Sequence, residues 1–158
     1  MPKSEEKTNV MRWLDKEKIP YVPHIYTDTA ETNGERIAER LGEDPALCLK
    51  TLVTTGKSGT HYVFVIPVAA TLNLKAAAAA VGEKSVEMLP LKDLLPLTGY
   101  VHGGCSPIGM KKFFRTTFDS SVEQAGHVYF SAGRIGCQVE LSLCDLAGRL
   151  RFTFAPLI

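Results

Sequence analysis

A lysine occupies a segment whose other residues are mostly apolar. Lys50 lies in Cys48-Leu49-Lys50-Thr51-Leu52-Val53, and the alternation of a strand places it on one face with Cys48 and Leu52. Such a lysine either lies at an edge with its ammonium extended into water, or is a buried cation that needs an anionic or carbonyl partner, because desolvation is costly. Residue type alone favours the first interpretation, since lysine is rarely fully buried. Under the second, Lys50 is a candidate catalytic residue.

A glycine-rich segment, Gly103 to Gly109, is the second candidate. Gly103 and Gly104 allow the backbone to approach a ligand closely because no Cβ intervenes. Their amides can donate to a carbonyl or to a developing oxyanion. Ser106-Pro107 then fixes a turn. A tight structural loop would use the same residues, so this motif has little specificity by itself.

A third candidate is the small-residue segment from Ser131 to Gly136, which contains one cation. The amides around Ser131 and Gly133 and the guanidinium of Arg134 suit a phosphate or a ribose. The segment has no GK[ST] and no helix start after it, so it is neither a P-loop nor a dinucleotide fingerprint.

The cysteines and histidines form no recognisable cluster in the sequence. The cysteines are Cys48, Cys105, Cys137 and Cys144, and none is in a C-x-x-C pair. His102 with Cys105 is the nearest approach to a metal pair and has no second pair, so no metal site is expected. Free, buried thiols in a reducing compartment are the favoured interpretation. A thiol-redox or metal enzyme using Cys105 and Cys137 stays an alternative, and His24 and His102 are candidate acid–base groups.

Capping residues and hydrophobic spacing predict the elements that carry these residues. The predicted helices are 4–18, one capped by Thr32 and ended by Gly42, 74–81 capped by Asn73, and 91–95 ended by Pro96 and Gly99. The predicted strands are 21–26, 48–54, 60–67, 100–102, 115–118, 127–130, 138–143 and 150–154, with hairpin residues at 56–59. The apolar run His61–Ile66 suits a central strand. We expect one α+β domain over residues 1–158, with a mixed, largely antiparallel, curled and barrel-like sheet and peripheral helices.

Length and charge restrict the function. The chain has 158 residues and a net charge of +1, which argues against a protein that binds nucleic acid mainly through phosphates. An RNA contact would be short or supported by a helper protein. The N-terminus has no signal-like apolar segment, and the apolar runs are too short to span a bilayer. We therefore expect a cytoplasmic protein that does not bind membranes.

Taken in order, these segments resemble the YbaK/EbsC family, relatives of the editing domain of bacterial prolyl-tRNA synthetases. The resemblance extends from Thr8 to Phe154. Its matching pieces are His24-Ile25-Tyr26, Ala30-Glu31-Thr32-Asn33, Leu49-Lys50-Thr51-Leu52, Val65-Ile66-Pro67-Val68, Val86-Glu87-Met88, Thr98-Gly99-Tyr100, Gly103-Gly104-Cys105-Ser106-Pro107-Ile108-Gly109, Ser131-Ala132-Gly133-Arg134 and Val139-Glu140-Leu141.

The resemblance implies the fold of the YbaK/prolyl-tRNA synthetase-associated domain and an aminoacyl-tRNA deacylase that edits in trans without cofactor or metal. Cys-tRNA(Pro) is the first expected substrate and Cys-tRNA(Cys) the second, whereas related branches remove alanine. The family's essential lysine falls on Lys50 and its pocket tyrosine on Tyr26. The expected substrate-binding residues are Tyr26, Gly103, Gly104, Ser106, Ser131, Gly133, Arg134 and Gln138. Gln138 departs from the family, which has an aspartate at this place, and this difference bears on the substrate preference more than on the reaction class.

The resulting hypothesis has Lys50 fix the ester near the terminal phosphate or ribose, and amides near Gly104 meet the oxyanion. A cysteinyl thiol would attack its own carbonyl, whereas an alanyl ester would need water. The expected partners are the acceptor end of proline tRNA and prolyl-tRNA synthetase, with monomer and homodimer both open. A deacylase for alanine or serine, or a non-catalytic tRNA- or synthetase-binding module, are the alternatives.

Overall fold

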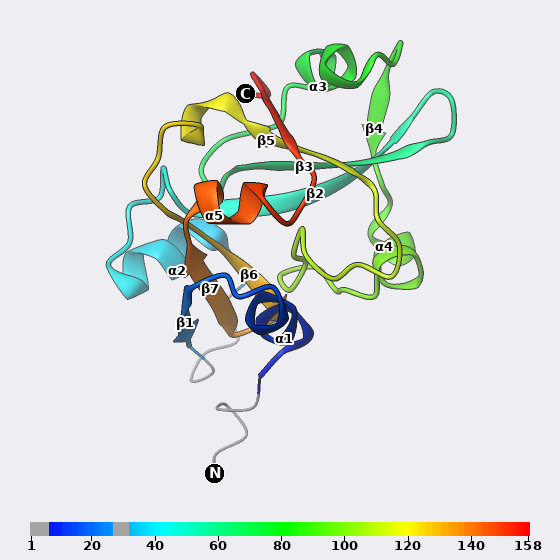
Figure 1. Ribbon diagram of the computed structural model, residues 1–158. Coiled ribbons are helices and arrows are strands. Elements are labelled where there is room, and N and C mark those ends of the chain that lie inside the picture. Colours follow the sequence, from blue (N-terminus) through cyan, green and yellow to red (C-terminus); the bar gives the residue numbers. More distant parts are fainter. Residues whose placement is uncertain (1–6, 27–31) are drawn as a thin grey trace.

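The computed structural model describes residues 7–26 and 32–158, and within them two β-sheets are surrounded by helices (Figure 1). The larger sheet has the strand order β4-β2-β3-β5-β8 and the smaller sheet the order β1-β7-β6. The strands are β1 (Tyr21–Ile25), β2 (Leu49–Gly56), β3 (His61–Pro67), β4 (Val86–Met88), β5 (Arg115–Asp119), β6 (Val128–Arg134), β7 (Cys137–Leu141) and β8 (Thr153–Ala155). The helices are α1 (Asn9–Lys16), α2 (Gly34–Leu41), α3 (Leu74–Val81), α4 (Leu91–Thr98) and α5 (Leu143–Ala147), with a 3₁₀ turn at Ser120–Val122.

Strand pairing is largely antiparallel over the two sheets together, as the sequence predicts: the smaller sheet is antiparallel throughout, whereas the larger sheet combines two antiparallel with two parallel pairs. The β2–β3 hairpin pairs Lys50 with Ile66, and β5 is parallel to both β3 and β8. An isolated bridge between Cys48 and Tyr129 joins the two sheets. The sheets do not close on each other, so the predicted barrel-like curl is not confirmed. Its physical alternative is two packed sheets, in which the three-residue strands β4 and β8 are left as edges.

Strand β3 is the centre of the larger sheet, which confirms the prediction for His61–Ile66. It lies between β2 and β5, and its residues after His61 are all buried. Phe64 and Ile66 belong to the apolar cluster that includes α3, whereas Val63 and Val65 belong to the cluster that includes α1, β6 and β7. Figure 1 shows α3 on one side of this sheet and the smaller sheet with α1 on the other. Each fully buried side chain of this size contributes about 1.5–3 kcal/mol.

The ends of the helices follow local side-chain chemistry. Asn73 caps α3 by accepting from the amide of Ala76 at 3.1 Å, and Gly82 ends it in the left-handed region at φ 76°. Both features are as predicted. Helix α2 begins one residue later than predicted, because Asn33 rather than Thr32 accepts from the amide two residues inside the helix.

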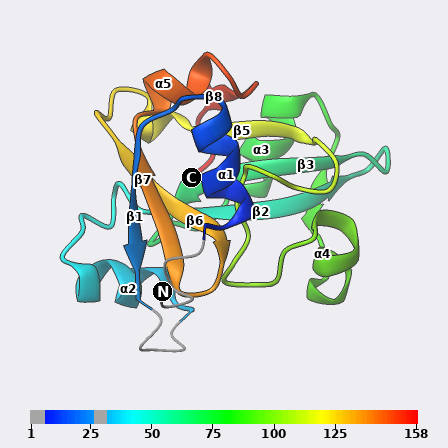
Figure 2. The same ribbon diagram turned by 60° about the horizontal axis from the view of Figure 1, so that its bottom comes forward.

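The N-terminal helix is shorter than predicted. Within the described residues, α1 begins at Asn9 after the cap Thr8, and the predicted part before residue 7 lies outside the described residues. Helix α1 crosses in front of β6 (Figure 2), and the two elements are in contact. No helix in residues 7–26 and 32–158 combines the length and hydropathy that a bilayer crossing requires.

Several other boundaries also differ. Residues 100–102 form no strand, because the Tyr100 hydroxyl donates to the carbonyl of Ile108 and the segment turns. Pro96 lies inside α4 instead of ending it. Leu143 begins helix α5, which the sequence did not predict. The segment from Ser131 to Gly136 is mostly strand rather than loop, with an irregularity in pairing between Ser131 and Arg134.

Candidate functional site

A cavity of about 170 Å³ lies where β2, β6, α2 and the turn before Cys105 meet. Its lining includes five of the residues singled out from the sequence: Tyr26, Lys50, Gly103, Ser131 and Gln138. The cavity is smaller than the 300–1,000 Å³ typical of pockets for drug-sized ligands. It therefore suits a small group such as an amino-acid side chain.

Lys50 supplies the cation of this cavity. It is the second residue of β2, is half-buried and lines the cavity wall. In the part of the chain that the structure describes, its ammonium has no hydrogen bond or ion pair. No carboxylate within residues 7–26 and 32–158 neutralises it. A partly desolvated ammonium without a protein partner is suited to an anionic or carbonyl ligand.

Glycine is required at residue 103 for two reasons. Its φ of +87° is left-handed, and a Cβ there would come within 2.8 Å of Cγ2 of Thr32. At Gly104 a Cβ would lie 3.0 Å from the amide nitrogen of Ile135. The turn therefore packs tightly against both the start of α2 and the β6–β7 hairpin.

The Gly104 amide itself is not free to meet an oxyanion in this geometry, and the expected contact from the other amides near Gly104 stays a prediction. That amide donates to the carbonyl of Val101 at 3.0 Å and so closes the turn. Gly103, not Gly104, belongs to the cavity lining. The Gly104 amide is already used, and an N–H group that makes one good bond is poorly placed to make a second.

Three other residues expected to bind substrate have structural contacts outside the cavity lining. Ser106 is fully buried, and its hydroxyl accepts from the amide of Ile108 at 3.3 Å. A Cβ at Gly133 would meet α1, 2.8 Å from Oδ1 of Asn9. The guanidinium of Arg134 donates to Sγ of Cys137 at 3.1 Å. These contacts position the turn, α1 and the β6–β7 hairpin, and the geometry does not support a substrate contact for the three residues.

Sequence reasoning missed Glu43, a carboxyl group that contacts two residues of the cavity lining, Cys48 and Gln138. The Cys48 thiol donates to Oε1 of Glu43 at 3.2 Å. With its amide nitrogen turned to the carboxylate, Gln138 donates to both oxygens of Glu43, 2.9 Å from Oε1. Burial raises the pKa of the Glu43 carboxyl. A carboxyl group of Glu43 therefore lies beside residue 138 even though that residue is a neutral amide. Nothing in the sequence around Asp44-Pro45 indicated this contact.

The cavity thiols are kept protonated. Burial raises the pKa of Cys105 to about 12. Burial, followed by the hydrogen bond to Glu43, raises the pKa of Cys48 well above that of an ordinary thiol. Since the thiolate is the reactive form, neither group is an activated nucleophile. The predicted alternative of a thiol-redox enzyme is disfavoured for Cys105, and Cys137 is buried beside Arg134.

The structure also shows the positions of Tyr26 and of the histidines. Burial raises the pKa of Tyr26 to about 12, so its hydroxyl is neutral in the cavity wall. His102 lines the cavity, whereas His24 pairs with Glu140 at 2.8 Å. His127 pairs with the other oxygen of Glu140 at 2.9 Å. Among the described residues, no group of three His, Cys, Asp or Glu side chains is arranged to hold a metal ion.

Comparison with known proteins shows which family this chain resembles. The family model described as the aminoacyl-tRNA editing domain matches residues 27–148. A protein of Enterococcus faecalis (strain ATCC 700802 / V583), named provisionally as the Cys-tRNA(Pro)/Cys-tRNA(Cys) deacylase EbsC, is 44% identical over 141 residues, which cover 89% of this chain and 86% of that protein.

Solved structures share the fold at lower identity. The crystal structure of hypothetical protein APE2540 superposes with a TM-score of 0.83 at 22% identity, covering 94% of this chain and 99% of the other. A crystal structure described provisionally as a trans-editing enzyme for prolyl tRNA synthetase gives a TM-score of 0.75 at 20% identity, covering 96% and 98%. The match to the family model and the relative at 44% identity together show that this chain belongs to the aminoacyl-tRNA editing domain family.

Proposed function

We propose that this protein hydrolyses the ester that joins a wrongly attached small amino acid to tRNA, acting on free aminoacyl-tRNA. Cys-tRNA(Pro) is the first candidate substrate and Cys-tRNA(Cys) the second, in line with the name of the relative at 44% identity. The observation that carries the proposal is the ammonium of Lys50, which lines a cavity of about 170 Å³ and has no partner among residues 7–26 and 32–158.

In this mechanism Lys50 binds the terminal phosphate or ribose and thereby holds the ester across the cavity. Fixing the reacting groups converts a bimolecular step into an effectively unimolecular one. Tyr26 and Gln138 line the same cavity and orient the aminoacyl group by hydrogen bonds. The Glu43 carboxylate holds the Gln138 amide in one orientation.

The attacking group comes from the substrate or from water, because the buried thiols of the cavity are protonated. For a cysteinyl ester, the substrate sulfur forms a bond to its own carbonyl carbon, and the bond from that carbon to the ribose oxygen breaks. The thiol proton ends on the ribose hydroxyl, and water later opens the thiolactone to free cysteine. For alanyl or seryl esters, water attacks directly.

Size is the expected basis of selection. A small cavity admits cysteine, alanine and serine, whereas the rigid ring of proline would clash. One methylene gives only about 1–3 kcal/mol of discrimination. Partial activity toward all three small amino acids is therefore expected, with cysteine fastest because its thiol is the best internal nucleophile.

The test is a deacylation panel with Cys-, Ala-, Ser- and Pro-charged proline tRNA and Cys-charged cysteine tRNA. Cys-tRNA(Pro) should lose its amino acid fastest and Pro-tRNA(Pro) no faster than in buffer. Similar rates for the cysteinyl and seryl esters would indicate water as the nucleophile in both cases. No hydrolysis of any ester above buffer would favour the non-catalytic binding module.

Lys50→Ala should lose most of the activity while the protein stays folded, because the ammonium holds the ester and not the sheet. Lys57→Ala, an exposed lysine at the tip of the same β2–β3 hairpin, is the matched control and should keep the wild-type rate. A folded Lys50→Ala variant with wild-type turnover would remove Lys50 from the mechanism.

A further inference from the structure

A second cavity, of about 300 Å³, shares no lining residue with the first and has no part in the ester chemistry. Its lining includes Trp13 of α1, Ile108, Met110, Lys112 and Phe113 of the loop before β5, and Leu150. Phe113 is 53% exposed although it is a large aromatic residue. The volume of the second cavity lies at the lower end of the range for pockets that hold small-molecule ligands, so one planar heterocycle is a suitable occupant.

The surroundings of this second cavity are basic in an otherwise balanced chain. We call Lys111, Lys112, Arg149 and Arg151 its basic rim: Lys112 is in the lining, and the other three are exposed residues next to lining residues in the sequence, Lys111 also donating to the carbonyl of Pro96 at 3.4 Å. Within the described chain, no acidic residue adjoins a lining residue. With a net charge of +1 for the whole chain, this concentration favours an anionic partner.

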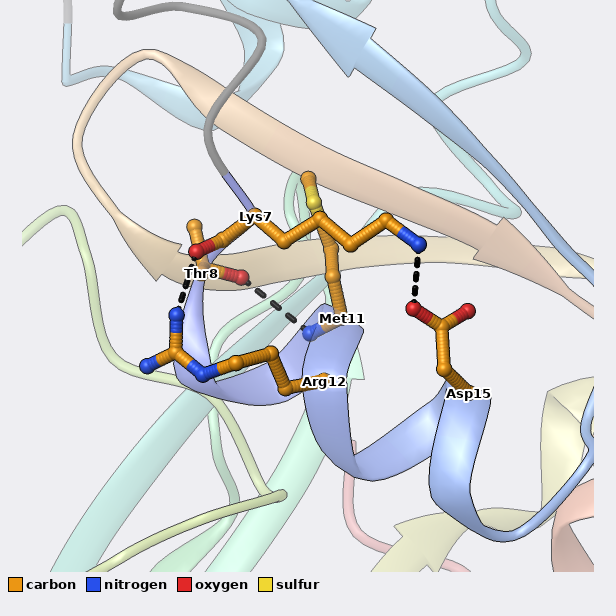
Figure 3. Close-up of polar contacts among 5 residues, drawn as sticks. All are labelled: Lys7, Thr8, Met11, Arg12 and Asp15. Carbon is orange, nitrogen blue, oxygen red and sulfur yellow. Dashed lines mark hydrogen bonds and ion pairs between the residues drawn. The ribbon is translucent and has the colours of Figure 1, made fainter.

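Helix α1 contributes to the same electrostatic pattern. Arg12 precedes Trp13, and its guanidinium donates to the carbonyl of Lys7 (Figure 3). The nearest acid on this helix, Asp15, is paired with Lys7. The negative charge closest to Trp13 along the helix is therefore paired with a cation of the same segment.

One loop forms a wall of both cavities. Gly103 and Cys105 line the ester cavity, and Pro107 to Met110 line the second one. The Cα atoms of Cys105 and Pro107 are at most about 7 Å apart, the reach of two extended residues. Since stacked nucleotides advance by about 3.4 Å each, an ester held in the first cavity brings the preceding nucleotides within reach of the second.

We infer that the second cavity binds an unpaired base of the single-stranded 3′ end of tRNA, stacked on Phe113 and Trp13, while the basic rim contacts the neighbouring phosphates. Aromatic side chains combined with cations are the usual means of binding single strands without sequence preference. The contact is short, which agrees with the small net charge. The inference rests on the proposed function for the identity of its ligand, and it adds a site that the ester chemistry does not require.

The experiment uses Trp13, the single tryptophan of the chain, as a probe inside the proposed site. A short uncharged RNA that ends in the tRNA 3′ sequence is titrated into the whole protein, and tryptophan fluorescence is recorded. We expect saturable quenching. Phe113→Ala should weaken binding by about five- to a hundredfold, the range for loss of one stacked base, and Phe113→Tyr should restore it. Ile158→Ala, a residue with the same 53% exposure, is the matched control and should bind normally.

The charge contribution is tested by salt dependence. Lys112→Gln should weaken RNA binding and reduce the slope of log K against log salt by about 0.7, the value for one phosphate contact on a single strand. Lys57→Gln, at the tip of the β2–β3 hairpin, should leave the slope unchanged. With full Cys-tRNA(Pro), Phe113→Ala should raise KM and keep kcat, whereas hydrolysis of 3′-O-cysteinyl adenosine should not change.

These outcomes separate this inference from the proposed function. Quenching by RNA in a protein that hydrolyses no ester would refute the deacylase and leave the base site supported. Active deacylation without any change in Trp13 fluorescence would overturn the base site alone. Quenching that Phe113→Ala leaves unchanged would also overturn it. A fourth outcome would also overturn the base site: a change in Trp13 fluorescence that depends on protein concentration in the absence of RNA and that disappears in Phe113→Ala. Such a change would assign this surface to contacts between copies of the chain.

Discussion

Replacing Gln138 by aspartate, the residue expected from the family resemblance, should destabilise this protein in a pH-dependent manner. In the wild type, Gln138 donates to Glu43 at 2.9 Å from Oε1. An aspartate is one methylene shorter, so its carboxylate would lie roughly 4 Å from that of Glu43, given a carbon–carbon bond of about 1.5 Å. Two like charges at 4 Å repel by about 4 kcal/mol at an effective dielectric constant of 20.

Protonation of one carboxyl limits this cost. Holding a proton costs about 1.4 kcal/mol for each pH unit above the group's ordinary pKa, which is 4.5 for Glu43. The destabilisation by this repulsion is therefore limited to about 3 kcal/mol at pH 7 and to less than about 1 kcal/mol at pH 5. Solvent screening at the half-buried Glu43 lowers both values. The repulsion raises the pKa of the carboxyl pair in the folded variant. The stability of the variant is therefore retained below the pKa of the unfolded state and is lost as the pH rises through the pKa of the folded state.

The assay is urea unfolding of wild type and Gln138→Asp at pH 7 and pH 5. The deficit of the variant should shrink by about 2 kcal/mol between the two values. The double variant Glu43→Gln/Gln138→Asp exchanges the acid and the amide, and it should be close to wild type at both pH values. A deficit that is equal at pH 7 and pH 5, or no deficit at all, would refute the contact between residues 43 and 138.

Two further predictions concern backbone and thiols. Gly103→Ala should destabilise the protein by about 2 kcal/mol or more in urea unfolding, because it combines a left-handed φ with a Cβ against Thr32. The control is Gly59→Ala, which is also left-handed at φ +90° but has nothing within 4 Å, and it should lose only about 1–2 kcal/mol. Equal losses in the two variants would contradict the close approach to Thr32. In the folded protein at neutral pH, iodoacetamide should modify the exposed Cys144 and spare Cys105, because burial raises the pKa of Cys105 to about 12. Mass spectrometry of the modified protein identifies the labelled cysteines. Rapid labelling of Cys105 would show that the cavity thiol is not protected.

The sequence by itself determined the local elements and the family. Asn73 and Gly82 define α3 because a cap bonds to an amide only a few residues away. The turn residues Gly56 to Gly59 similarly specify the β2–β3 hairpin. Lys50 and Tyr26 were identified as site residues through the resemblance, and the structure places both in one cavity with Gly103, Ser131 and Gln138.

Tertiary structure alone decided which polar groups meet. Glu43 and Gln138 lie 95 positions apart and come together only when the segment after α2 folds against β7. The donation of the Gly104 amide to Val101 also depends on the folded geometry, as does the lack of a partner for Lys50 among the residues that the structure describes. Spacing and residue type report contacts within a turn or a strand, whereas burial, pKa and free hydrogen-bonding capacity depend on neighbours that are distant in sequence. For that reason the elements were predictable from residue order, and the electrostatics of the cavity were not.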